Sequence, residues 1–220
     1  MGTRGSDQQG IEPMDRNRRF WDRTAKKSFK APIGDEAAYE HKLEKTREYL
    51  TPDSEVLEFG CGTGGTAVLH APHVKHYLAT DISDEMLNFG RERAREAGVQ
   101  NITFQRANFD ELDAAPESFD AVLGLSIIHL MQDPEAAIAR AFRLLKPGGV
   151  FVTSTVCIAD GLWFLVPVIP LMQLFGLAPH VKFLSARRLR KSMETAGFTI
   201  EYEWWPKRSK ALFLVCRKPG

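Results

Sequence analysis

Residues 56–64 read Val-Leu-Glu-Phe-Gly-Cys-Gly-Thr-Gly, an apolar segment that contains an acid and continues into three glycines at alternate positions. Residues without a Cβ let the backbone come close to a ligand where a strand passes into a helix. Asp81 follows at about the 20-residue spacing that places a carboxylate on ribose hydroxyls in a βαβ unit. These residues predict a binding site for a cofactor that contains adenosine.

The glycine spacing by itself also fits an NAD enzyme, because Gly60, Gly62 and Gly65 match the G-x-G-x-x-G fingerprint. The end of the chain favours another class. Two strand-like segments, 198–205 and 211–217, are joined by a short polar turn, as in a terminal antiparallel hairpin. The second nicotinamide-binding half that is typical of a dehydrogenase does not fit into this part of the chain.

Hydrophobic periodicity predicts alternating strands and helices around the glycine-rich turn. Strands are predicted over 55–59, 76–80, 102–106, 121–125 and 149–155, and helices over 39–50, 66–69, 85–97, 134–145 and 185–196. Asp133 and Ser185 are the predicted N-caps of the last two helices. The alternation predicts an α/β fold with a doubly wound, mostly parallel sheet that ends in the antiparallel hairpin.

Four motifs come in the order and spacing seen in class I S-adenosylmethionine-dependent methyltransferases. They are Glu58-Phe-Gly-Cys-Gly-Thr-Gly64, Thr80-Asp81-Ile-Ser, Phe119-Asp-Ala-Val-Leu and Leu145-Lys-Pro-Gly-Gly149. The chain resembles that family from about Tyr39 to its C-terminus, and is similar to the small methyltransferases of ubiquinone and menaquinone biosynthesis. The resemblance implies a Rossmann-like fold, S-adenosyl-L-methionine as the cofactor, and transfer of its methyl group.

The resemblance also implies a role for each residue of the cofactor site. The turn from Gly60 to Gly64 faces the methionine part of the cofactor, with Glu58 ordering the turn or reaching the amino group through water. Asp81 accepts both ribose hydroxyls, because an ionised carboxylate is an acceptor matched to two donors. The predicted cofactor-binding residues are Glu58, Gly60, Cys61, Gly62, Gly64, Asp81, Ile82, Met86, Asn108, Phe109 and Ser126.

Several of these assignments have alternatives. Ile82 and Met86 pack against the adenine or simply belong to the core. Asn108 stands where many relatives carry an Asp that accepts the adenine amino group, and a shift of the alignment by two residues gives that role to Asp110 instead. Ser126 lies at the carboxyl end of the fourth strand, where open α/β sheets bind their ligands.

His129 is the histidine expected near the transferable methyl, and imidazole has a pKa suited to deprotonating a hydroxyl or thiol. The alternative is a histidine satisfied by local backbone. A sulfonium donor is already activated, so the transfer needs aligned partners and exclusion of water more than it needs a strong base. His70, His73 and His76 are interpreted as surface histidines and not as metal ligands, because Pro72 interrupts their shared face.

Residues 161–181 contain no ionisable side chain except His180. We interpret 160–184 as an apolar lid insertion in which Trp163 and Phe164 contact a substrate. The segment 15–39 is interpreted as the other wall, and its aromatic side chains, Phe20, Trp21, Phe29 and Tyr39, either contact the ligands or serve as packing anchors. The alternatives are a helix that completes the core and a membrane-surface attachment that is supported by the basic run 187–191. The predicted acceptor is a small apolar molecule methylated on oxygen, sulfur or nitrogen. The runners-up are a lipid or quinone precursor at the bilayer surface and a non-catalytic cofactor-binding protein.

The composition predicts one domain of 220 residues, with a disordered tail over 1–15 and an N-terminal helical segment over 16–50. A formal net charge of +1 argues against binding to nucleic acid. The three cysteines are odd in number and lack the spacing of a zinc site, so they are expected to be reduced thiols of a cytoplasmic protein. The sequence does not indicate an oligomeric state.

Overall fold

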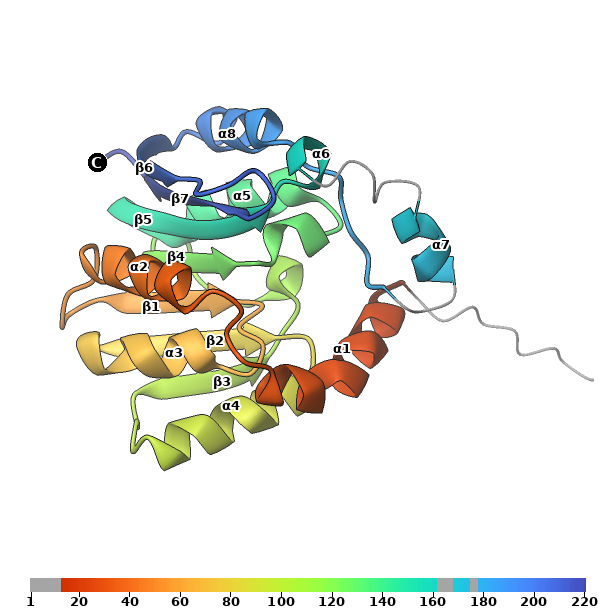
Figure 1. The fold of residues 1–220 in the computed structure, drawn as a ribbon. Coiled ribbons are helices and arrows are strands. Elements are labelled where there is room, and N and C mark those ends of the chain that lie inside the picture. The colour runs from red at the N-terminus through yellow and green to blue at the C-terminus, as the bar shows by residue number, and fades with distance from the viewer. Residues whose placement is uncertain (1–12, 162–167, 175–177) are drawn as a thin grey trace, which may run out of the picture.

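The computed structural model describes residues 13–161, 168–174 and 178–220. It is built around a seven-stranded sheet in the order β3-β2-β1-β4-β5-β7-β6 (Figure 1). The strands are β1 (Glu55–Phe59), β2 (His76–Asp81), β3 (Ile102–Arg106), β4 (Phe119–Leu125), β5 (Leu145–Val156), β6 (Thr199–Trp204) and β7 (Ala211–Arg217). The first five strands are parallel, and β7 runs antiparallel to both β5 and β6. The predicted doubly wound sheet with its C-terminal hairpin is confirmed.

The helices and short turns have the following bounds. They are α1 (Pro13–Lys30), α2 (Glu36–Arg47), α3 (Gly65–His70), α4 (Asp84–Glu96), α5 (Pro134–Leu144), α6 (Ile158–Gly161), α7 (Val168–Leu174) and α8 (Ala186–Thr195), with short 3₁₀ turns η1 (Ala71–His73), η2 (Phe109–Glu111) and η3 (Ile128–Leu130). The side chains of Asp35, Ser83, Asp133 and Ser185 each accept a hydrogen bond from the amide three residues further on. These bonds satisfy amides that have no partner inside the helix.

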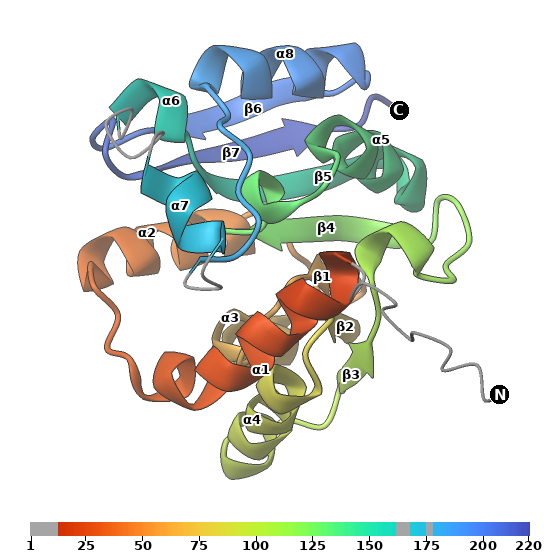
Figure 2. The same ribbon diagram turned by 90° about the vertical axis from the view of Figure 1, so that its right-hand side faces the viewer.

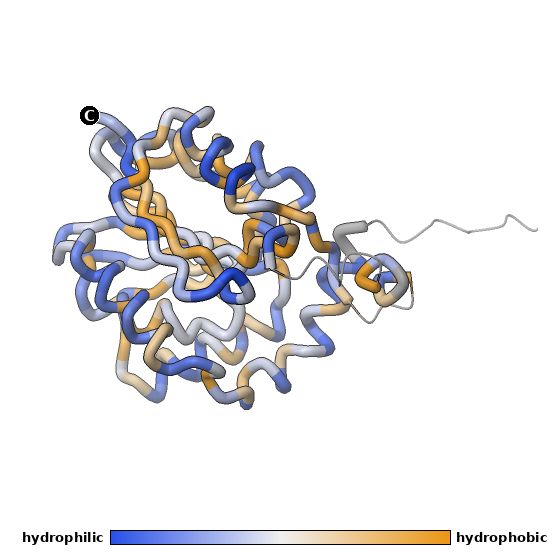
Figure 3. The backbone as a smooth tube through the Cα atoms, turned by 45° about the horizontal axis from the view of Figure 1, so that its top comes forward, coloured by the Kyte–Doolittle hydropathy of each residue, from blue (hydrophilic) through white to orange (hydrophobic). Residues whose placement is uncertain are grey.

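The sheet is covered on both faces, with α2, α3 and α4 on one side and α5 and α8 on the other (Figures 1 and 2). Alternating strand residues feed two cores, so that Val56 belongs to one core and Leu57 to the other. Central strands that are buried on both faces need apolar residues at nearly every position. Figure 3 shows the result, with hydrophobic positions gathered in the strands and many hydrophilic ones on the outer helices.

Helix α1 runs across the carboxyl-end edge of the sheet and packs on α4 (Figure 2). It begins at Pro13, inside the predicted disordered tail. The Ser83 hydroxyl donates a hydrogen bond to Asp22 at 2.6 Å, and the Phe29 ring stacks on Phe89 with 4.5 Å between centroids. The Arg93 guanidinium lies over the Phe29 ring and donates to the Phe29 carbonyl oxygen. Phe29 is therefore a packing anchor that fixes α1 in place.

The prediction that His70 lies at the surface is wrong. This side chain is fully buried in α3, and both of its ring nitrogens lack a hydrogen-bond partner among the described residues. Burial lowers the pKa of His70 to about 3, so the ring is neutral at pH 7. The regular spacing of His70, His73 and His76 suggested that all three share one environment. However, α3 ends at His70, so only this histidine lies on the buried face of the helix.

Candidate active site

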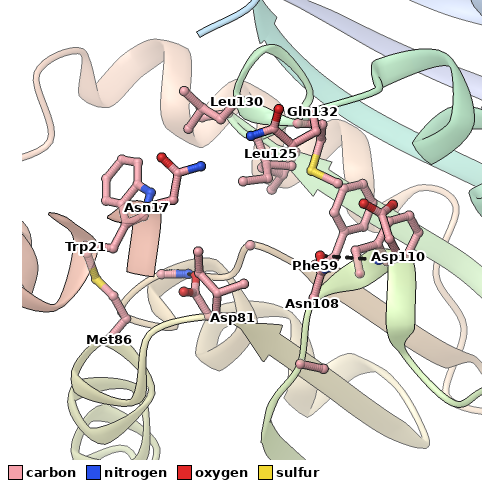
Figure 4. Close-up of a pocket in the computed structure, with 18 of the residues that line it drawn as sticks. Asn17, Trp21, Phe59, Asp81, Met86, Asn108, Asp110, Leu125, Leu130 and Gln132 are labelled. Carbon is pink, nitrogen blue, oxygen red and sulfur yellow. Dashed lines mark hydrogen bonds between the residues drawn. The ribbon is translucent and has the colours of Figure 1, made fainter. Parts of the chain in front are cut away.

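A cavity of about 810 Å³ opens between α1 and the carboxyl ends of the parallel strands (Figure 4). Each strand from β1 to β4 contributes residues at or just after its carboxyl end, and α1 and the segment around the end of η3 complete the wall. The lining residues include Asn17, Trp21, Gly60, Gly62, Asp81, Ile82, Met86, Asn108, Phe109, Asp110, Leu125, Ser126, Ile127, Leu130, Met131 and Gln132. Open α/β sheets bind their ligands at this edge.

The glycine-rich turn has left-handed backbone, with φ of 65° at Gly60, 54° at Gly62 and 68° at Gly64. A Cβ at Gly60 would lie 2.6 Å from the Ile127 side chain, so glycine is needed for Ile127 to pack against the turn. Gly64 does not line this cavity, nor a smaller cavity on the other side of the turn. A Cβ there would lie 3.0 Å from the Cα of Gly90 in α4, which shows that Gly64 is needed for close packing of helices.

Asp81 ends β2 and is only 9% exposed. One carboxylate oxygen accepts from the Gly62 amide and the other from the Ser83 amide, both at 2.9 Å. Burial raises the pKa of Asp81, and the two amides oppose that shift. Each oxygen keeps a further lone pair, so the group can also accept hydrogen bonds from a ligand in the cavity.

The other predicted adenine contacts lie in the same cavity. Asn108 and Asp110 both line it, and the Asn108 side-chain oxygen accepts from the Asp110 amide at 3.4 Å (Figure 4). Phe109 is buried and stacks on Phe59, with 3.8 Å between ring centroids. The choice between Asn108 and Asp110 as the partner of the adenine amino group therefore stays a prediction.

Ser126 occupies a strained position at the end of β4. Its φ is 59°, a backbone conformation that residues other than glycine rarely adopt. Its amide donates a hydrogen bond to the Ser154 carbonyl oxygen at 2.7 Å. Strain of this kind gathers at functional sites. Ser126 lines both the large cavity and a smaller one beside it.

The smaller cavity, of about 210 Å³, lies under α2 and shares Gly60, Gly62, Leu125 and Ser126 with the larger one. Tyr39, Glu58 and Cys61, which the sequence assigned to the substrate or the cofactor, line this smaller cavity and not the larger one. Lys42, Thr66, His70 and Ser154 complete most of its wall.

Glu58 is buried in β1, where its Oε2 accepts a hydrogen bond from the Tyr77 hydroxyl at 2.9 Å. Burial raises the pKa of Glu58 to about 8, with a further increase from the nearby Asp81 and a partial decrease from the Tyr77 hydrogen bond. The carboxyl group is therefore largely protonated at pH 7 as long as no positively charged group lies beside it.

We expect Glu58→Gln to flatten the decline of stability with rising pH. The folded-state pKa of about 8 lies above the ordinary value of 4.5, so between these values the folded protein holds a proton that the unfolded chain has released. This contribution to stability is complete below about pH 4.5 and is lost as the pH rises through 8, by at most about 1.4 kcal/mol per pH unit. Urea unfolding of both proteins at several pH values measures the difference.

The variant should gain stability relative to the wild type as the pH rises. Glu55→Gln is a suitable control, since Glu55 begins the same strand but its side chain reaches solvent and pairs with Lys75. A Glu58→Gln difference that does not change with pH would contradict the prediction.

His129 does not line either cavity. Its Nδ1 is buried without a hydrogen-bond partner among the described residues, and its carbonyl accepts from the Lys182 amide at 2.7 Å. Burial lowers the pKa of His129 to about 4. The ring is therefore neutral at pH 7 and lines neither of these two cavities, so its role as a general base stays a prediction.

Two predicted substrate contacts, Trp163 and Phe164, lie outside the described residues. The sequence placed Trp21 in the segment expected to form the other wall but missed Asn17. The two residues are four apart on one face of α1, and both line the large cavity. That spacing was a usable signal. Gln132 carried no comparable signal, because it follows a short 3₁₀ turn.

Residues 56–149 match the family model described as the methyltransferase domain. The ubiquinone/menaquinone biosynthesis C-methyltransferase UbiE of Vibrio vulnificus is 34% identical over 102 residues, which are 44% of this chain and 39% of that protein. The uncharacterized methyltransferase YcgJ of Bacillus subtilis is 31% identical over 100 residues, 46% of this chain and 40% of that protein. The chain thus matches about two fifths of the length of these relatives.

A solved structure extends the similarity in fold to nearly the whole chain. Geranyl diphosphate C-methyltransferase of Streptomyces coelicolor superposes with a TM-score of 0.74 at 13% identity, covering 95% of this chain and 98% of that one. That protein was crystallised with Mg²⁺, geranyl diphosphate and S-adenosyl-L-homocysteine. In the chain described here, no group of three or more His, Cys, Asp or Glu side chains suited to a metal ion occurs among the described residues.

Proposed function

We propose that this chain is a methyltransferase that moves the methyl group of S-adenosylmethionine to a small, apolar acceptor. The observation that carries the proposal is the position of Asp81 beside the Gly60–Gly62 turn in one cavity of about 810 Å³. A nucleoside and an acceptor both fit within the size range of such ligand pockets.

The cofactor supplies a methyl group that is already activated on a sulfonium, and the residues of the chain hold, align and shield the reactants. Asp81, Ile82 and Met86 hold the adenosine part, and the backbone at Gly60 and Gly62 leaves room for the sulfur. Trp21 and Leu130 form the apolar wall where the acceptor lies. Because alignment and exclusion of water carry the reaction, it needs no strong base in the cavity.

The acceptor atom is oxygen, sulfur or nitrogen on the sequence evidence, and the names of relatives such as UbiE add carbon to this set. Trp163 and Phe164 belong to the proposal as acceptor contacts within an apolar lid over 160–184. A cytoplasmic location with reduced thiols is also part of the proposal, and Cys61, Cys157 and Cys216 are all free.

Calorimetric titration with S-adenosylmethionine, S-adenosylhomocysteine and NAD tests the proposal. We expect the first two to bind with dissociation constants on the order of micromolar, and NAD not to bind. Binding of NAD alone, or of none of the three, would overturn the proposal.

A second candidate is a methyltransferase that takes its acceptor from an anionic membrane surface, and the charge of α1 favours it. This helix exposes Arg16, Arg19, Arg23, Lys26, Lys27 and Lys30, although the whole chain has a formal net charge of only +1. On the same side of the molecule α7 exposes Val168, Met172 and Leu174, the last of them by 77% (Figure 1). Cations beside apolar side chains suit the interface of an anionic bilayer.

The basic and apolar surfaces meet at the mouth of the large cavity. A groove lined by Arg16, Phe20, Gln173 and His180 joins α1 to α7, and the His180 amide donates to the Asn17 side chain at 3.2 Å. Asn17 in turn lines the large cavity. No helix among the described residues is both long and apolar enough to cross a bilayer, so the contact in this candidate is peripheral.

Co-sedimentation with phosphatidylglycerol vesicles and with phosphatidylcholine vesicles tests this candidate. The wild type should bind the anionic vesicles, and replacing Arg16, Arg19 and Arg23 by Ser should weaken binding roughly a hundredfold, since each cation contributes about 1 kcal/mol. Replacing Arg187, Arg188 and Lys191 of α8 by Ser is the matched control. The sequence offered this basic run as the membrane contact, but α8 lies away from α1 and α7 (Figure 1), so this variant should have little effect. Failure of the wild type to bind, or equal losses in both variants, would reject the role of α1.

A further inference from the structure

The groove between α1 and α7 has a lining that differs in chemistry from the large cavity beside it. Its volume is about 190 Å³, and two cations, a histidine and three amide side chains make up most of its wall. The lining residues are Arg16, Asn17, Phe20, Arg23, Gln132, Gln173, Ala178 and His180. None of these described residues is an acid. A wall with positive charge, many hydrogen-bond donors and no carboxylate suits an anion.

Arg16 and Arg23 supply the positive charge of the α1–α7 groove. With Phe20 they are spaced four and three residues apart, so the three side chains lie on one face of α1. Both arginines are exposed, and neither pairs with an acid among the described residues. The guanidinium group is a planar fork of donors that matches two oxygens of a carboxylate or a phosphate. Both side chains are therefore available to bind an oxyanion.

Uncharged donors of the same wall are held in place by their own hydrogen bonds. The Asn17 side-chain oxygen accepts from the His180 amide at 3.2 Å, which leaves the NH₂ group of Asn17 to donate. The Gln173 Nε2 donates one hydrogen bond to the Pro179 carbonyl oxygen at 2.8 Å and keeps a second N–H. The His180 Nε2 is buried without a hydrogen-bond partner among the described residues. A ligand oxygen that supplies this partner removes the cost of leaving the buried nitrogen unpaired.

The α1–α7 groove meets the large cavity at Asn17 and Gln132, which line both. These two side chains lie across the large cavity from Asp81 in Figure 4. The large cavity beside them has an apolar wall that includes Trp21 and Leu130. A ligand that spans the junction therefore has an apolar body and one anionic end, and the small volume of the groove suits a single end group.

We propose that the α1–α7 groove binds a carboxylate or phosphate at the end of the methyl acceptor, with Arg16 and Arg23 as the partners of its oxygens. This assignment rests on the proposed function. It narrows the acceptor from any small apolar molecule to an anionic amphiphile whose apolar body lies against Trp21 and Leu130. The two arginines then determine which acceptors bind, because a neutral molecule of the same length cannot form charge-assisted hydrogen bonds with them.

Three probes that differ only in their polar end test the assignment. Protein saturated with S-adenosylhomocysteine is titrated by calorimetry with octyl phosphate, octanoate and 1-octanol, each dispersed as a monomer. We expect both anions to bind roughly ten- to hundredfold more tightly than 1-octanol, the effect of one charge-assisted hydrogen bond. This comparison uses the wild type, so it is decisive even if a variant does not fold.

Arg16→Gln/Arg23→Gln removes both cations from the groove. It should bind octyl phosphate roughly ten- to hundredfold more weakly than the wild type does. Its affinity for 1-octanol should not change, which also shows that the variant is folded. Arg19→Gln/Lys26→Gln is the matched control, because these two cations are exposed on the same helix but do not line the groove. The control should bind all three probes as the wild type does.

Two kinds of result would overturn the assignment. One is a wild type that binds S-adenosylhomocysteine but binds octyl phosphate no more tightly than 1-octanol, or binds none of the probes. The other is an equal loss of octyl phosphate affinity in the two double variants, which would show that only the general charge of α1 matters. Failure of the proposed function gives a different result, in which the wild type does not bind S-adenosylhomocysteine at all.

Phosphatidylglycerol vesicles distinguish a lipid headgroup from a dispersed acceptor as the source of the oxyanion. If the groove takes a lipid headgroup, Arg16→Gln/Arg23→Gln should lose vesicle binding in co-sedimentation and Arg19→Gln/Lys26→Gln should keep it. If the groove takes a dispersed acceptor, the two variants should bind the vesicles alike and differ only toward octyl phosphate. Either result supports an oxyanion subsite and identifies its ligand.

Discussion

Asp81→Ala should weaken binding of S-adenosylmethionine and S-adenosylhomocysteine by roughly a hundredfold, because in the proposed function this carboxylate accepts two charge-assisted hydrogen bonds from the ribose. The carboxylate is held in place by the Gly62 and Ser83 amides, so its orientation toward the cavity is fixed before a ligand arrives. Calorimetric titration of both ligands measures the loss. The effect should be similar for the two ligands, since they share the ribose.

Asp84→Ala serves as the control for this prediction. Asp84 lies three residues further on, but its carboxylate is more than half exposed and pairs with Arg106 at 2.9 Å, outside the cavity. Its replacement should leave the affinities unchanged. Asp81→Asn keeps one acceptor oxygen and should give an intermediate loss, and full affinity in Asp81→Ala would rule out the ribose contact.

Phe59→Ala should lower the free energy of unfolding by about 3–5 kcal/mol, the range for loss of a fully buried aromatic side chain. Phe59 is 1% exposed, stacks on Phe109 and lies 6.2 Å from Phe151 between ring centroids. Because Phe59 also lines the large cavity, the variant should lose cofactor affinity as well. Urea unfolding and calorimetric titration measure the two effects.

Phe89→Ala provides the comparison, since Phe89 also sits in a stacked pair, with Phe29, but is only partly buried and lies outside the cavity. We expect it to cost about 1 kcal/mol, the usual size for a side chain of this kind. Equal destabilisation by the two variants would show that Phe59 is not a central part of the core.

The sequence by itself determined the architecture and the centre of the cofactor site. Strands and helices alternate because each must bury an apolar face against the next, and this requirement leaves a local pattern. The strand bounds of β1, β3 and β7 match the predicted ranges. Gly60, Gly62 and Asp81 were identifiable because a left-handed turn and a carboxylate at the end of β2 are properties of short segments.

The tertiary structure alone decided which side of the turn each residue occupies. Glu58, Cys61 and Tyr39 share a small cavity with Lys42, whereas Asn17 and Trp21 close the large one from a helix far away in the sequence. His129 follows β4 as predicted, yet it lines neither cavity, and its Nδ1 is buried. Such positions depend on how distant segments pack against each other. Packing of that kind leaves no periodicity or spacing along the chain, so the structure had to supply it.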